Sequence, residues 1–98
     1  MPTYITLLKW TEKGIGSVKE SPDRLDAAKE AYKAVGAELK EFYLVMGQYD
    51  GVFVIEAPDD ETVAKLALTF GPAGVTVRTE TMRAFTEEEY RRIIAALP

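Results

Sequence analysis

Residues 38–57, ELKEFYLVMGQYDGVFVIEA, contain two strand-like runs joined by a turn, and this stretch decides the fold. The runs at 38–46 and 51–57 are rich in β-branched and aromatic residues, which favour strands. The connecting residues 47–51 are Gly-Gln-Tyr-Asp-Gly, a composition that is typical of a tight turn. We therefore predict an antiparallel hairpin at the centre of the chain.

Further elements are predicted on both sides of this hairpin. A strand at 3–10 and a helix at 21–36 precede it, while a helix at 59–70, a strand at 75–85 and a terminal helix from 87 follow it. A short helical turn is predicted at 17–20. The order β-α-β-β-α-β plus a terminal helix predicts one domain, residues 1–98, with an α+β ferredoxin-like fold. Its four-stranded antiparallel sheet carries two helices on one face.

The predicted helix ends rest on capping signals. Ser21 before Pro22 is a candidate N-cap, and so is Asp59 at the start of the second helix. Thr86 and Glu89 have the spacing of a capping box. The run 71–74, Gly-Pro-Ala-Gly, is expected to end the second helix.

The central strands are apolar on both faces. Phe42, Leu44 and Met46 alternate with Tyr43 and Val45, so both faces carry apolar side chains. Exposing either set of side chains to water would be energetically unfavourable. Two helices cover only one face of such a sheet. We expect a second or third copy of the chain to cover the open face; the alternative is that the terminal helix folds back over it.

Composition excludes several functional classes. The 98 residues contain no Cys and no His, which excludes thiol nucleophiles, disulfides, histidine bases and zinc or haem sites held by these side chains. The net charge is −4, which disfavours nucleic acid as a partner. The longest apolar runs are far too short to span a membrane. We expect a cytoplasmic protein without cofactor or metal.

The segment Gly47-Gln48-Tyr49-Asp50, together with its surroundings, resembles the GYD domain family. Similar segments extend over nearly the whole chain: Ser21-Pro22, Phe42-Tyr43, Met46-Gly47, 56–60, 77–85 and 87–90. The resemblance implies a ferredoxin-like fold of the dimeric α/β-barrel kind and implies no particular reaction. The loop 69–74 departs from the family pattern, with Pro72 where Ser is more usual.

Tyr49 and Asp50 are the first candidate functional residues. A phenol beside a carboxylate at a sheet edge is able to bind a polar ligand or transfer a proton. The structural alternative is that Asp50 accepts hydrogen bonds from backbone N–H groups of the turn while Tyr49 packs.

A second group of candidates lies on the strands. Arg78 and Glu80 share one face, where Arg78 is able to bind an anion and Glu80 to act as a base; an ion pair is the alternative. Arg83 is expected on the other face. Trp10 and Tyr43 are candidate ligand-binding aromatics, although aromatic residues on strands more often serve the core.

Three interpretations of function remain open. The leading one is a homo-oligomeric scaffold or small-ligand-sensing module without catalytic activity. The alternative is a cofactor-independent enzyme that acts on a small organic substrate, with Tyr49 and Asp50 for proton transfer and Arg78 for anion binding. A surface rich in Ala, Glu, Lys and Arg also leaves open an engineered building block of a larger assembly.

Overall fold

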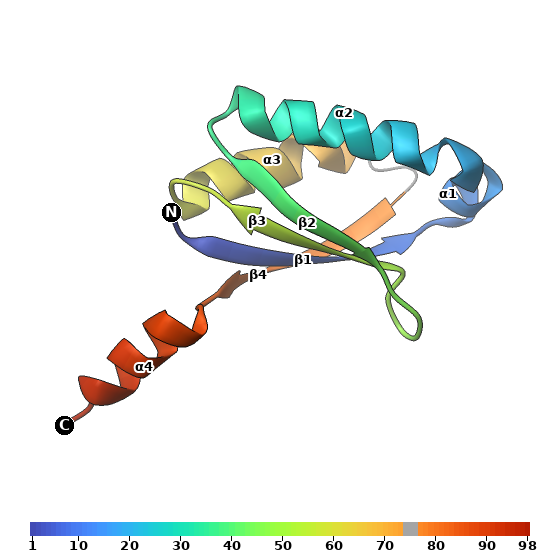
Figure 1. The fold of residues 1–98 in the computed structure, drawn as a ribbon. Helices are drawn as coiled ribbons and strands as arrows, with labels where there is room; N and C mark the ends of the chain where they lie inside the picture. Colours follow the sequence, from blue (N-terminus) through green and yellow to red (C-terminus); the bar gives the residue numbers. More distant parts are fainter. Residues whose placement is uncertain (74–76) are drawn as a thin grey trace.

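The secondary-structure elements follow one another along the described residues, 1–73 and 77–98, of a computed structural model (Figure 1). Their bounds are β1 Thr3–Trp10, α1 Glu12–Gly16, the 3₁₀ helix η1 Val18–Glu20, α2 Ser21–Ala34, β2 Glu38–Leu44, β3 Gly51–Glu56, α3 Asp60–Ala73, β4 Val77–Ala84 and α4 Glu87–Ala95. The strands form one sheet in the order β2-β3-β1-β4, with every neighbouring pair antiparallel. This is the predicted ferredoxin-like α+β fold.

Helices α2 and α3 lie on the same face of the sheet, and the hydrophobic core lies between these layers (Figure 1). The buried core residues are Tyr4, Tyr32, Ala37, Leu39, Ile55, Ala57, Val63 and Leu66. In the sheet register Tyr4 lies opposite Ile55, and Thr6 lies opposite Phe53, so these positions share the helix-covered face. Their sequence neighbours point to the other face, which we call the open face.

Most predicted elements are confirmed, and their ends follow local hydrogen bonding. Asp59 caps α3, because its Oδ1 accepts a hydrogen bond from the Thr62 backbone N–H at 2.8 Å. The Thr86/Glu89 capping box is present at α4. The 3₁₀ helix η1 confirms the short turn predicted at 17–20.

Several predicted boundaries are wrong. Ser21 is the first residue of α2 rather than its cap, because η1 leads directly into the helix and Glu20 takes the cap position without a side-chain hydrogen bond. Helix α3 continues to Ala73 instead of ending near Phe70. Strand β2 ends at Leu44, and β4 begins at Val77; the predicted strand positions 75 and 76 lie outside the described residues.

Two glycines shape the β2–β3 connection. Gly47 has a φ of +117°, a conformation that side chains with a Cβ rarely adopt. Gly51 begins β3 where a Cβ would lie 2.9 Å from Phe42 Cε2 and 3.0 Å from Leu8 Cγ. The absence of a side chain at Gly51 therefore lets Leu8 and Phe42 approach each other across the sheet.

Helix α4 does not cover the open face. It continues from the end of β4 and projects away from the sheet (Figure 1). The apolar residues Tyr90, Ile93 and Ile94 of α4, and Leu97 just after it, are all exposed, at 45–61%. The alternative in which the terminal helix folds back is therefore wrong for this structure, because β4 leads the chain outward instead of turning it across the strands.

Candidate functional site

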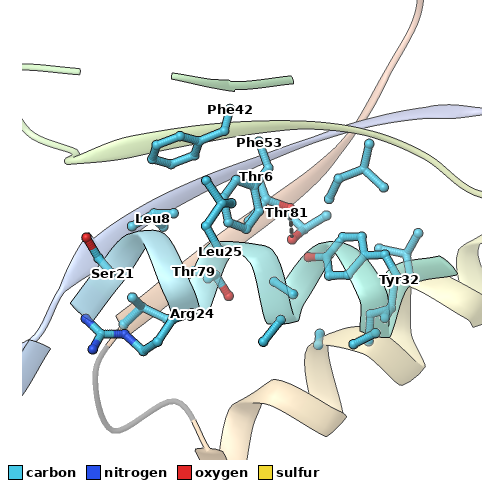
Figure 2. A pocket seen from close by; sticks show the side chains of 18 of the residues that line it. Thr6, Leu8, Ser21, Arg24, Leu25, Tyr32, Phe42, Phe53, Thr79 and Thr81 are labelled. Atoms are coloured by element: carbon cyan, nitrogen blue, oxygen red, sulfur yellow. Dashed lines mark hydrogen bonds between the residues drawn. The ribbon is translucent and has the colours of Figure 1, made fainter. Parts of the chain in front are cut away.

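A cavity of about 580 Å³ lies between α2, α3 and the helix-covered face of the sheet (Figure 2). Most of its wall is apolar and comes from these residues: Leu8, Trp10, Pro22, Leu25, Ala27, Ala28, Ala31, Tyr32, Phe42, Phe53, Ile55, Val63, Leu66, Ala67 and Val77. Ligand pockets of small proteins are roughly 300–1,000 Å³ and are similarly apolar. Its polar lining consists of Thr6, Ser21, Arg24, Thr79 and Thr81.

Residue size along α2 explains why side chains do not fill this space. The Tyr32 ring packs edge-on against Phe53, with 6.4 Å between ring centroids, and Phe53 packs against Phe42 at 5.5 Å. These rings hold the helix away from the sheet. Ala28 and Ala31 face the same space but are too small to fill it. Alternation of large and small residues on one helix face therefore opens the cavity.

The polar groups of the cavity occupy distinct places. On the sheet side of the cavity, the Thr6 and Thr81 hydroxyls form a 2.8 Å hydrogen bond with each other. Each hydroxyl therefore has a hydrogen-bond partner within the sheet. At one end, Arg24 lies beside Ser21, while Tyr32 lies at the opposite end (Figure 2). The cavity is therefore apolar along its length and cationic at one end.

The ionisation of the Tyr32 phenol at alkaline pH tests whether this residue is buried beside the cavity. Burial raises the pKa of the Tyr32 phenol from 10.0 to about 12. The neutral phenol is favoured in the fold, so its contribution is fully present below pH 10 and lost as the pH rises to about 12. A pKa difference of one between the folded and unfolded states corresponds to about 1.4 kcal/mol, so the loss approaches roughly 3 kcal/mol.

We expect the free energy of unfolding of the wild type to fall more steeply over this alkaline range than that of Tyr32→Phe, which cannot ionise. Urea denaturation at a series of pH values measures both curves. Burial also raises the pKa of Tyr4 to about 12, so the variant retains a smaller alkaline loss. Parallel curves for wild type and variant would show that Tyr32 is not buried as described.

A smaller hollow of about 230 Å³ lies on the open face. Its lining residues are Leu7, Lys9, Gln48, Tyr49, Arg78, Thr79 and Glu80. The Tyr49 hydroxyl donates a 2.5 Å hydrogen bond to Glu80 Oε2, and this bond raises the pKa of the phenol. The sequence-predicted Tyr49, Arg78 and Glu80 are thus brought together here.

Asp50 forms hydrogen bonds with β1 rather than with Tyr49 or Glu80. Its Oδ2 accepts a hydrogen bond from the Trp10 backbone N–H at 2.9 Å, and its own N–H donates to the Leu8 carbonyl at 2.9 Å. Asp50 therefore joins the β2–β3 connection to the end of β1. The carboxylate and the Tyr49 hydroxyl have different partners, so the structure does not join them as a proton-transfer pair.

The remaining sequence candidates are separated. Trp10 lines the larger cavity, whereas Tyr43 lies on the open face of β2, opposite Val52, and is 54% exposed. Arg83 lies opposite Tyr4 on the helix-covered face, as predicted. Its guanidinium is 5.5 Å from the centre of the Tyr4 ring, and Arg83 Nη2 is 3.8 Å from a Glu89 carboxylate oxygen. Arg83 therefore connects β4 to α4.

The sequence interpretation missed Arg24 and the alanines of α2. Neither Arg24 nor the α2 residues Leu25, Ala28 and Tyr32 are among the candidates named from the sequence. The available signal was the number of alanines on this face, since a buried stripe with small residues at its centre leaves unfilled volume. Arg24 directly precedes Leu25 in the sequence and gave no signal of its own.

The described part of the chain shows neither a metal-binding cluster nor a membrane-spanning helix. Within it, no group of three or more Asp or Glu residues is placed to hold a metal ion. No helix in residues 1–73 or 77–98 is long and apolar enough to cross a membrane.

Comparison with known proteins gives one family match. The model of the GYD domain matches residues 4–94. A protein of Thermus thermophilus, described as a glutamine synthetase and cystathionine beta-lyase binding protein, is 35% identical over 85 residues. The match covers 86% of this chain and 88% of that protein.

Solved structures show the same fold. The protein TTHA0845 of Thermus thermophilus is 26% identical, with a TM-score of 0.55, and the match covers 88% of this chain and 95% of that one. An FFRP protein is 23% identical, with a TM-score of 0.63, and the match covers 87% of this chain and 100% of that one. MtbAldR is 10% identical, with a TM-score of 0.68, over 87% of this chain and 53% of its own. These neighbours have the ferredoxin-like, dimeric α/β-barrel type of fold.

Proposed function

The chain belongs to the GYD domain family, and from this premise we propose that it is a homo-oligomeric binding module that takes a small apolar ligand between its helices and its sheet. The observation that carries this proposal is the cavity of about 580 Å³ beneath α2. This pocket is partly open to solvent, and its volume lies within the range of small-molecule binding sites. Its predominantly apolar lining also matches such sites, so we interpret it as a binding volume.

The open face supports the oligomeric part of the proposal. In the register, Ile5 lies opposite Val54 and Met82, and Leu7 lies opposite Val52. An antiparallel sheet with one solvated face normally alternates apolar and polar residues, but here the central strands are apolar on both faces. The occupant we propose is a second copy of the same chain, because sheets of this kind pack face to face.

Helix α4 supports the same conclusion from a different observation. A nine-residue helix is marginal in water unless its apolar stripe is packed. Here that stripe is exposed, and the contacts of α4 with the rest of the fold include the Arg83–Glu89 ion pair. Contact with another subunit would bury Ile93 and Ile94 and stabilise the helix.

The test of the ligand proposal uses Trp10, the single tryptophan of the chain, which lines the cavity. Decan-1-ol is a suitable neutral apolar probe. We expect a saturable change in Trp10 fluorescence at a stoichiometry of one decan-1-ol per chain. A change that never saturates, or no change at all, would contradict ligand binding in the cavity.

A second candidate function is binding to a metabolic enzyme. Its support is the 35% identity to the Thermus protein described as binding glutamine synthetase and cystathionine beta-lyase. We expect a mixture of this chain with purified glutamine synthetase to sediment as a complex in analytical ultracentrifugation. Separate sedimentation of the two proteins at micromolar concentration would argue against this second function.

The enzyme interpretation has weaker support. It needs Tyr49 and Asp50 to act together, yet their side chains have separate partners, Glu80 and the Trp10 backbone. The hollow beside Tyr49 also lies on the face that we assign to the second copy. Arg78 and Glu80 are then better placed to contribute to a subunit boundary.

A further inference from the structure

The Arg24 guanidinium, at the end of the cavity, has one nitrogen without a partner among the described residues, 1–73 and 77–98. Nη1 donates to the Ser17 carbonyl at 3.2 Å and to Ser17 Oγ at 3.3 Å. Nη2 is enclosed, and among the described residues it has no hydrogen-bond acceptor. A buried donor in this state loses its hydration without compensation, so an acceptor supplied from outside would be favoured.

The surroundings of Arg24 limit the charge of that acceptor. Glu20 Oε2 lies 3.8 Å from Nη1, and the Glu20 side chain is 74% exposed, so this carboxylate only partly neutralises the guanidinium. Arg24 supplies one positive charge, which balances a single negative charge, whereas a doubly charged group would leave excess negative charge near Glu20. The planar guanidinium fork also matches the two oxygens of a carboxylate.

The shape of the cavity limits the rest of the ligand. Arg24 and Tyr32 line its two ends, eight residues apart on α2, which corresponds to about 12 Å along the helix (Figure 2). The wall between them is apolar, from Leu25 and Ala28 on the helix to Phe53 on the sheet. Such a space fits an extended hydrocarbon chain.

We propose that the cavity binds an elongated apolar molecule with one terminal carboxylate, whose carboxylate accepts a hydrogen bond from Arg24 Nη2. This proposal rests on the proposed function, since it names the ligand class of the same cavity. Ser21 and Thr79 line the cavity with Arg24 and offer further hydroxyl donors to the second carboxylate oxygen.

The test compares decanoate with decan-1-ol, which share a chain and differ in the charged group. Dissociation constants from Trp10 fluorescence at neutral pH are measured for wild type, Arg24→Met and Arg24→Lys. We expect Arg24→Met to weaken decanoate binding about tenfold or more and to change decan-1-ol binding less than about twofold. Arg24→Lys keeps the charge and should lie between wild type and Arg24→Met for decanoate.

Lys29→Met is the matched control, because it removes a cation from the same helix at an exposed position outside the cavity. It should leave both dissociation constants unchanged. Equal weakening of decanoate by Lys29→Met and Arg24→Met, or no weakening by Arg24→Met, would overturn the role of Arg24 while the apolar cavity still binds decan-1-ol. Failure of the wild type to bind either probe would overturn the proposed function and this inference together.

Discussion

Val54→Asp should convert the proposed homo-oligomer to a monomer with a molar mass near 10.9 kDa. Val54 is central on the open face, opposite Ile5 on one side and Glu41 on the other. Packing a second sheet over this position would bury an unpaired carboxylate, which costs several kcal/mol. We expect association to weaken at least about 100-fold, or about 2.8 kcal/mol. Light scattering over a dilution series measures the change.

The matched control is Leu68→Asp, which places the same carboxylate at a residue of α3 that is 74% exposed. It should keep the oligomeric mass of the wild type. Circular dichroism of both variants separates loss of association from loss of folding. A Val54→Asp protein that is folded and still oligomeric would show that the open face is not the interface.

Ala28→Phe should abolish binding of decan-1-ol. Ala28 is partly buried on α2 and lines the cavity beside Leu25, so a phenyl ring at this position occupies the space that the ligand needs. Because the ring replaces ligand contacts instead of entering a full core, the cost of overpacking should be small. We expect affinity for decan-1-ol to fall at least about thirtyfold, or about 2 kcal/mol.

Isothermal titration calorimetry provides the measurement, since it does not depend on how the new ring affects Trp10 emission. Ala34→Phe is the control, because Ala34 is exposed at the end of the same helix and does not line the cavity. It should bind decan-1-ol like the wild type. Retained binding by Ala28→Phe would place the ligand elsewhere on the molecule.

The fold was predictable because its signals are local and repeated. Alternation in 38–44 and 51–56 specifies strands, and the Thr86/Glu89 capping box marks the start of α4. The errors are misplaced ends of elements and one short helix that was not predicted. Helix α1 escaped prediction because five residues show no period, although Thr11 Oγ1 caps it by accepting from the Gly14 N–H at 3.2 Å.

The site was less predictable because it depends on distances between elements. Tyr49 and Glu80 are 31 residues apart, and they meet at 2.5 Å because β3 and β4 both pair with β1. The space beneath Ala28 exists because Tyr32 and Phe53 hold α2 away from the sheet. A sequence pattern identifies which residues face a core, but it does not show whether that core is full.

The most direct test of the proposed function is to map decan-1-ol on the ¹⁵N-labelled protein by NMR. We predict saturable chemical-shift changes for backbone amides along α2, including those of Leu25 and Ala28, and for Trp10 at the end of β1. The amides of exposed α4 should change little. Changes centred on Val52 and Val54 of the open face, or no changes at all, would contradict a binding site between the helices and the sheet.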